Sequence, residues 1–209
     1  IGNFIHKQYD SLVAFIIFNL ASLIIGVNRN NFENALSKGA EFNKSFLVRV
    51  DFYRQMLKEP ILIRKKLKNF PSSGRVILTW SRLYKDMMID KVLISVSVLL
   101  KKNRDLNLVI IGDGPEKDDL VKLASNLGIL KQCYFLGFKP RSYIRSAAHY
   151  SNVICLPYSG LSLIEAGIMK CAVVAFDYEW NSELIVDGYS GYLADSRNIE
   201  DIKTKLEKL

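Results

Sequence analysis

From residue 75 onward, short apolar runs alternate with longer amphipathic segments, and this alternation constrains the fold more than any other feature. The apolar runs have the length of β-strands, and the segments between them have the period of helices. The expected strands are residues 75–80, 106–111, 132–136, 153–156 and 172–176. Apolar strands separated by helices are typical of parallel sheets covered on both faces. The sequence therefore predicts an α/β fold with a doubly wound, Rossmann-like parallel sheet.

The helices expected between these strands have clear apolar faces or terminal signals. In the first of them the apolar face contains Val92, Leu93, Val96 and Leu99 or Leu100, and Gly128 occupies the position that follows a helix end. Asn198 is the expected cap of the last helix. The expected helices are residues 86–102, 116–127 and 141–149, a helix after Gly160, a short turn at 182–186 and a helix after Asn198.

The segment 12–25 is apolar apart from Asn19 and Ser22. Its length is short of the roughly 20 residues that a bilayer requires, and it lacks the charged start and cleavage site of a signal peptide. We predict a buried helix at about 6–20 leading into a short buried strand at about 22–27, with a membrane segment as the alternative.

Few strong patterns follow in residues 28–73, and 51–69 is expected to be a charged helix or linker interrupted by Pro60. The turn cluster 69–74 predicts a boundary between a first part, 1–73, and the Rossmann-like domain, 74–209. The chain begins with Ile1 and ends within a helical pattern, so we expect it to be part of a longer protein.

The formal net charge of +8 favours anionic partners, either nucleotide diphosphates, acidic lipid headgroups or nucleic acid. Nucleic acid is not expected, because no compact Arg-rich motif with interleaved aromatic residues is present. The basic run 65–68 is interpreted as a solvated helix face. Three cysteines without a Cys-x-x-Cys pair indicate reduced, buried thiols in the cytosol (Cys133, Cys155 and Cys171). With only His6 and His149, a histidine-based metal site is not expected.

Ligands of doubly wound domains bind beyond the carboxyl ends of the strands, and several suitable residues follow the expected strands. Two cations, several glycines and a helix start fall on this one edge. A glycine turn lets backbone approach a ligand, and a helix start favours phosphate or sugar oxygens. The alternatives are a surface cation pair and an ordinary strand–turn–helix with a surface Glu. The candidates are Arg82, Lys85, Gly112, Gly114, Gly137, Phe138, Tyr158, Gly160, Leu161, Ser162 and Glu165.

Six motifs in this order and spacing make the chain from about residue 75 similar to the C-terminal, donor-binding domain of the family 4 glycosyltransferases. Residues 1–50 also resemble the end of such an enzyme's acceptor domain. These are retaining enzymes of the GT-B fold, which consists of two Rossmann-like halves. The motifs are Ser81-Arg82-Leu83 with Asp90, 109–115, Phe135-Leu136-Gly137, 160–166, Val173-Val174-Ala175, and 183–188 with Gly191-Tyr192-Leu193.

The resemblance implies a role for each candidate residue. Arg82 and a nearby lysine, Lys85, would hold the donor diphosphate as the catalytic cations. The loop from Gly112 to Pro115 would shape the nucleotide pocket, and the segment 136–139 would contact the base. Gly160, Leu161 and Ser162 would present amides to the sugar or phosphate, and Glu165 would bind the ribose hydroxyls. A role for Glu183 is assigned less firmly. No metal or other cofactor is implied.

Two departures from the family pattern matter. The family usually has a Glu-x7-Glu pattern, and here the loop before Glu165 contains no acid: Tyr158 lies seven residues upstream. The usual Lys-Gly-x-Asp is replaced by Met87-Met88-Ile89-Asp90, so that Lys85 is the expected substitute for the lysine.

The expected function is therefore a retaining transfer of a sugar from a nucleotide-diphosphate sugar to a glycan or lipid-linked acceptor, in polysaccharide biosynthesis. We expect a cytoplasmic protein, with peripheral contact to an anionic membrane as an open option, and a chain that is inactive without the rest of its acceptor domain. The alternatives are a non-catalytic nucleotide-sugar-binding relic and an α/β regulatory or interaction domain.

Overall fold

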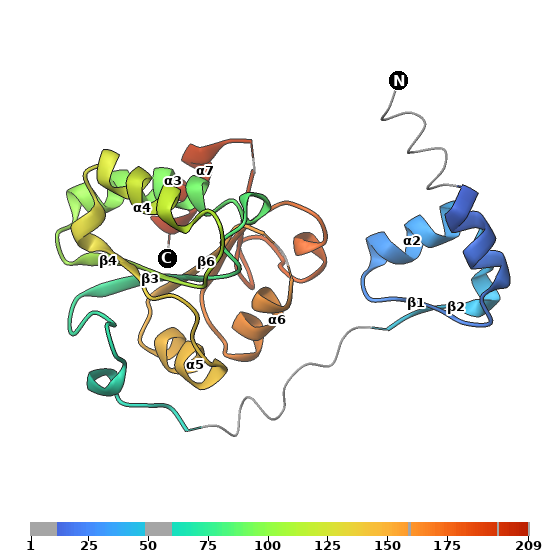
Figure 1. Cartoon of the computed structure of the whole chain (residues 1–209), viewed down its shortest axis with the longest axis horizontal. Helices are drawn as coiled ribbons and strands as arrows, with labels where there is room; N and C mark the ends of the chain where they lie inside the picture. Colours follow the sequence, from blue (N-terminus) through green and yellow to red (C-terminus); the bar gives the residue numbers. More distant parts are fainter. Residues whose placement is uncertain (1–11, 49–59, 159, 196, 209) are drawn as a thin grey trace. The chain divides into compact units, whose positions relative to one another are not determined.

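The computed structural model describes residues 12–48, 60–158, 160–195 and 197–208. It divides the chain into two compact units, residues 1–51 and 52–209 (Figure 1). The predicted helix start at 6–11, residues 51–59 of the predicted linker and Ser159 lie outside the described residues. Among the helices that are described, none combines the length and the apolar character needed to cross a bilayer.

The first unit contains a helix at residues 12–20 and a small parallel sheet. Asn28 caps the second helix, because its side chain accepts a hydrogen bond from the Asn31 N–H at 2.7 Å. Strand β2 was not predicted from the sequence. The remaining elements are β1 (Ile24–Gly26), α2 (Arg29–Ser37), η1 (Phe42–Lys44) and β2 (Ser45–Leu47).

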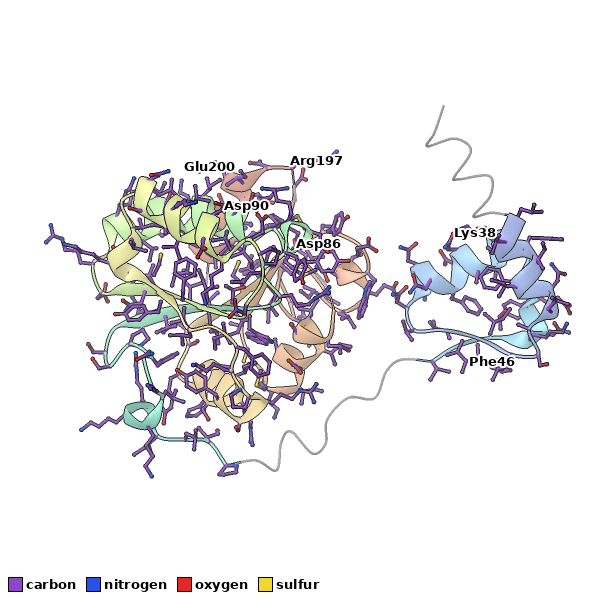
Figure 2. The ribbon with its side chains drawn as sticks, viewed as in Figure 1. Lys38, Phe46, Asp86, Asp90, Arg197 and Glu200 are labelled. Carbon is purple, nitrogen blue, oxygen red and sulfur yellow. The ribbon has the colours of Figure 1, made fainter. Side chains whose placement is uncertain are left out.

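The prediction of a buried helix before residue 20 is wrong for the described residues. Leu12, Phe15, Ile16 and Ile17 are exposed, and Leu20 is 80% exposed. The predicted buried strand is only partly so, since Ile24 and Gly26 are buried while Ile25 is exposed. Phe46 of β2 is exposed as well (Figure 2). An apolar pattern shows which residues favour burial, but it does not show that the chain supplies their partner.

The second unit is the predicted doubly wound domain. Its six strands have the order β5-β4-β3-β6-β7-β8, and every neighbouring pair is parallel. The strands β3 and β4 pair from Arg75 with Leu106 to Trp80 with Ile111. The strands are β3 (Arg75–Trp80), β4 (Leu106–Ile111), β5 (Cys133–Phe135), β6 (Val153–Leu156), β7 (Val173–Phe176) and β8 (Tyr192–Ala194).

Helices α3, α4 and α7 cover one face of this sheet, and α5 and α6 cover the other (Figure 1). Alternate strand residues therefore enter two separate cores: Leu108 and Ile110 pack under α3, whereas Val109 and Ile111 pack on the opposite side. The helices are η3 (Arg64–Lys66), η4 (Lys85–Met87), α3 (Ile89–Lys102), α4 (Lys117–Asn126), η5 (Leu130–Gln132), α5 (Arg141–His149), α6 (Leu161–Ile168), η6 (Asn181–Glu183) and α7 (Ile199–Leu206).

Helix α3 begins later than predicted. Met88 has φ 54°, in the left-handed region, and this residue separates η4 from α3. The predicted apolar face of the helix is confirmed, with Val92, Leu93, Val96, Leu99 and Leu100 buried. Asn198 precedes α7 as predicted, but its side chain makes no capping hydrogen bond.

The second unit begins before the boundary at residues 73 and 74 that the turn cluster predicts. Leu67 and Phe70 are buried in the core on the α5 and α6 side. The Leu62 N–H donates to Ser146 Oγ of α5 at 2.9 Å, and Tyr143 Oη donates to the Lys68 carbonyl at 2.8 Å. The segment before the turn cluster is therefore part of the second unit.

Cys133 and Cys155 are buried and Cys171 is half-buried, and all three are free thiols as predicted. Burial raises the pKa of Cys133 and Cys155 to about 12 and that of Cys171 to about 11. These thiols are therefore protonated and unreactive at neutral pH.

Candidate functional site

The loops after β3 and β4 pack against each other at the carboxyl edge of the sheet. The Ser81 N–H donates to the Ile111 carbonyl at 3.1 Å, and the Leu83 N–H donates to the Asp113 carbonyl at 3.0 Å. In the other direction, the Glu116 N–H donates to the Leu83 carbonyl at 3.1 Å. These bonds continue the pairing of the two strands beyond their ends, so the backbone around Arg82 is held against the loop that follows β4.

Two glycines make this close packing possible. Gly112 has φ 143° and Gly114 has φ 159°, and a Cβ atom at either position would collide with the carbonyl oxygen of Ser81 or Leu83, respectively. The Gly112 N–H also donates to the Gly137 carbonyl at 3.0 Å, which joins the loop after β5 to the same edge. The structure thus brings together three of the predicted glycines, Gly112, Gly114 and Gly137.

A cavity of about 220 Å³ opens where these loops meet. Its walls combine apolar side chains with two cations, Arg82 and Lys139, and Phe138 at its mouth is 80% exposed. Apolar walls with a few polar groups are typical of small-molecule sites. The lining residues are Trp80, Ser81, Arg82, Ile111, Gly112, Asp113, Phe138, Lys139 and Ile144.

Glu165 is only 6% exposed and has two partners. Its Oε2 accepts a hydrogen bond from Trp80 Nε1 at 3.1 Å, and its Oε1 lies 3.4 Å from Arg141 Nε. Burial raises the pKa of this carboxyl, while the Trp80 hydrogen bond and the Arg141 charge partly counteract the increase. The alternative interpretation of Glu165 as an ordinary surface residue is therefore wrong.

Trp80 and Arg141 were not among the residues predicted for the site. Trp80 carried one usable signal: it ends a buried strand, and a buried indole N–H usually has an acceptor. That acceptor is Glu165, 85 residues later in the chain. The Trp80–Glu165 hydrogen bond joins the last residue of β3, two residues before Arg82, to helix α6 at the carboxyl edge of the sheet.

The start of α6 faces open space. Gly160 has φ 140°, and a Cβ atom built there would meet no atom within 4 Å. No side chain caps the helix, Leu161 is exposed and Ser162 is half-buried. The amides of the first turn, with the positive end of the helix dipole, suit an anionic or hydroxyl-bearing ligand.

Tyr158 precedes the start of α6 and packs beside Tyr178. Its ring lies 5.8 Å from that of Tyr178, measured between centroids. Burial raises the pKa of Tyr158, the nearby Glu179, Tyr178 and Asp86 raise it further, and Arg82 lowers it. Tyr158 is thus within electrostatic range of Arg82, from the loop after β3, and of Glu179, from the loop after β7.

Lys85 lies apart from the cavity, in η4. Its Nζ is 3.7 Å from Asp90 and 3.8 Å from Glu116, and the side chain is 78% exposed. Figure 2 labels Asp86 and Asp90, which lie on either side of the start of α3. Met87, at the position of the family's lysine, is buried in the core. Glu183 is the last residue of η6. Among the described residues, no group of three or more His, Cys, Asp or Glu could hold a metal ion.

Comparison with curated proteins finds transferases. The chain is 27% identical over 150 residues to a poly(ribitol-phosphate) alpha-N-acetylglucosaminyltransferase of Staphylococcus aureus, covering 69% of this chain and 30% of that protein. It is 28% identical over 215 residues to an N-acetylgalactosamine-N,N'-diacetylbacillosaminyl-diphospho-undecaprenol 4-alpha-N-acetylgalactosaminyltransferase of Campylobacter jejuni, covering 98% of this chain and 57% of that protein. The chain thus spans between about a third and somewhat over half of these relatives.

Solved structures confirm the fold. Anabaena HepE in complex with UDP superposes with a TM-score of 0.77 at 17% identity, covering 97% of this chain and 58% of that one. A Staphylococcus aureus TarM mutant in complex with Fondaparinux, alpha-GlcNAc-glycerol and UDP gives 0.74 at 22% identity, covering 97% and 39%. The fold is thus that of GT-B enzymes. Residues 62–209 match the family described as glycosyl transferases group 1, and the chain belongs to this family.

Proposed function

We propose that the second unit is the donor-binding half of a retaining glycosyltransferase, which transfers a sugar from a nucleotide-diphosphate sugar. The observation that supports this proposal best is the Trp80–Glu165 hydrogen bond, because it joins the end of β3, two residues before Arg82, to the helix that begins after Gly160. In this proposal a guanidinium, a helix start and a carboxylate contribute to one ligand position at the carboxyl edge of the sheet. The UDP bound by the related GT-B structures is consistent with such a donor.

In this proposal the charges of the edge stabilise the departing diphosphate. The planar Arg82 guanidinium forms paired hydrogen bonds with phosphate oxygens, and the amides at the start of α6 add fixed partial positive charge. Both are in place before charge develops on the leaving group, which is the condition for efficient electrostatic catalysis. The bond between the sugar and the diphosphate breaks, the acceptor hydroxyl oxygen bonds to the same face of the sugar, and the hydroxyl proton passes to the departing diphosphate oxygen, without a protein nucleophile or a metal ion.

The remaining residues would hold the nucleoside. Glu165 keeps acceptor capacity beyond its bonds to Trp80 and Arg141, because a carboxylate has about four lone-pair positions. It would accept from the ribose hydroxyls. The cavity walls at Gly112, Gly137 and Phe138 would contain the base, and Leu161 and Ser162 would approach the sugar or phosphate with Tyr158 beside them.

The acceptor is proposed to be a glycan or a lipid-linked carrier, and the site of action the cytoplasmic side of a membrane. The choice of acceptor follows the relatives, whose names include a polyol-phosphate polymer and a diphospho-undecaprenol carrier. Lys85 is the weakest of the proposed catalytic residues, since its ammonium group lies beside Asp90 and Glu116.

One observation favours a second candidate function, a nucleotide-sugar-binding relic. Met87 occupies the position of the family's phosphate lysine. Its thioether side chain is buried in the core, where it cannot contact a phosphate as the lysine would. A protein of this kind would bind the donor without transferring the sugar.

Calorimetry with UDP, GDP, their sugars and the free nucleosides tests the donor site. We expect Arg82→Ala to weaken nucleotide-diphosphate binding by about tenfold or more and nucleoside binding little, because the arginine contacts only phosphate. The matched control is Arg104→Ala, which removes an exposed arginine from the turn before β4. Equal UDP affinities for the Arg82 variant, the control and the parent would exclude this site.

A transfer assay separates the enzyme from the relic. The assay uses a protein that joins this chain to an acceptor-binding half, with and without EDTA. Sugar transfer that continues in EDTA supports the metal-free transferase, and donor binding without transfer supports the relic.

A further inference from the structure

A second cavity, of about 180 Å³, lies on the α5 and α6 side of the domain and is lined by Ile61, Arg145, His149, Ile168, Met169 and Lys170. Arg145 and His149 are one helical turn apart near the end of α5, and Lys170 follows α6. Because α5 and α6 run back from the carboxyl edge of the parallel sheet, their ends lie at its amino edge. This cavity shares no lining residue with the candidate donor site.

The charge of this cavity is one-sided. Arg145 and Lys170 are cationic, His149 can become so, and none of the six lining residues is acidic. A cation near a helix end is normally explained by the negative end of the helix dipole, and this accounts for His149 in the last turn of α5. It does not account for Arg145, which lies a full turn earlier.

Arg145 provides the second observation. Its Nη1 atom is buried and has no hydrogen-bond partner among the described residues. A buried donor without a partner costs free energy, and the cost is larger for a charged group. Arg145 lines the cavity, so an anion bound there would supply the missing acceptor once the guanidinium turns toward it.

We propose that Arg145, His149 and Lys170 form a binding site for a phosphate group, separate from the donor site. The neighbouring surface fits the headgroup of an anionic lipid. Ile61 is 40% exposed and Ile63 is 56% exposed, with the exposed Lys65 and Lys66 in the same segment. The Leu62 N–H bond to Ser146 Oγ holds this segment against α5. Exposed apolar side chains beside lysines suit a bilayer interface, and soluble phosphate shares the same chemistry at the cavity.

The site is tested by an NMR titration of the chain with inorganic phosphate. We expect saturable shifts of the backbone amides of His149 and Lys170, and an apparent dissociation constant about tenfold higher in Arg145→Gln. Arg104→Gln, which removes an exposed arginine, is the control and should bind phosphate like the parent. The double variant His149→Gln/Lys170→Gln repeats the test with both changes at exposed positions, where folding is not at risk.

Co-sedimentation with vesicles distinguishes the two sources of phosphate. Vesicles of phosphatidylglycerol and phosphatidylcholine are compared with phosphatidylcholine alone. Binding to the anionic vesicles that is reduced in Arg145→Gln but not in Arg104→Gln supports a site for a lipid headgroup. Phosphate shifts without this vesicle difference support a site for soluble phosphate. The proposal is overturned if neither ligand distinguishes Arg145→Gln and the double variant from Arg104→Gln.

Discussion

At the scale of single residues, Glu165 makes stability depend on pH. Its pKa in the folded protein is raised above the unfolded value, mainly by burial. Between these two values the folded state binds more protons than the unfolded state, so the free energy of unfolding falls as pH rises and then becomes constant above the raised pKa.

Replacement of Glu165 by Gln should remove this fall, since the amide does not titrate and still accepts from Trp80. Urea unfolding at a series of pH values from about 4 to about 8 measures the decrease in the free energy of unfolding. The lower limit lies near the ordinary pKa of a Glu side chain. Glu200→Gln, at an exposed position of α7, is the control and should keep the slope of the parent. The same slope in Glu165→Gln and the parent would contradict this account of the carboxyl.

Lys170 has a left-handed backbone, with φ 57°, directly after the end of α6. Glycine is the residue preferred at such positions. We expect Lys170→Gly to raise the free energy of unfolding by about 0.5–1 kcal/mol, as the left-handed conformation costs glycine nothing. The control is Lys122→Gly within α4, which should lower it by about 1 kcal/mol. Chemical denaturation of the parent, Lys170→Gly and Lys122→Gly measures the three free energies of unfolding. A lower value for Lys170→Gly than for the parent would argue against backbone strain at this position.

At the scale of elements, the loops after β3 and β4 depend on Gly112. A methyl group there collides with the Ser81 carbonyl, whereas one at Gly160 meets open space. Gly112→Ala should therefore cost about 2–4 kcal/mol, from overpacking and backbone strain, and should displace Arg82.

In the matched variant Gly160→Ala the new methyl group meets no neighbouring atom, and only the unusual φ angle is unfavourable. This variant should therefore lower the free energy of unfolding by about 1–3 kcal/mol and leave Arg82 in place. Thermal unfolding, followed by a crystal structure of each variant, compares them. Equal loss of stability with an undisturbed Arg82 in both would contradict the role of Gly112.

Much of the second unit could be predicted from the sequence because its strands are continuous apolar runs. Strands β3, β4 and β6 match the predicted residues, and β5 and β7 differ by single residues at their ends. The left-handed Met88, which delays α3, carries no such signal, because its sequence neighbours are ordinary helix formers. The partners of Glu165 also could not be predicted, since a contact between residues 80 and 165 depends on which strands become neighbours.

At the scale of the whole molecule, the segment before residue 74 determines where the second unit begins. It buries Leu67 and Phe70 and bonds to α5 through Leu62 and Lys68. A fragment 74–209 should therefore be less stable than 60–209 by about 3–6 kcal/mol, because each buried side chain contributes about 1.5–3 kcal/mol.

Thermal unfolding of the two fragments measures this difference. The double variant Leu67→Ala/Phe70→Ala in fragment 60–209 is the control, since it removes the same side chains without shortening the chain, and it should approach the shorter fragment in stability. Equal stability of fragments 60–209 and 74–209 would restore the turn cluster as the boundary.

The hydrogen bonds between the segments 81–83 and 111–113 have a consequence for evolution and for engineering. These two stretches are separated by some thirty residues in the chain, but their hydrogen bonds make them one structural unit. A change in one of them is tolerated only if the other accommodates it, so the proposed donor preference should not be transferable by exchanging either stretch alone. Variant libraries of these loops should therefore vary both stretches together and keep Gly112 and Gly114 fixed.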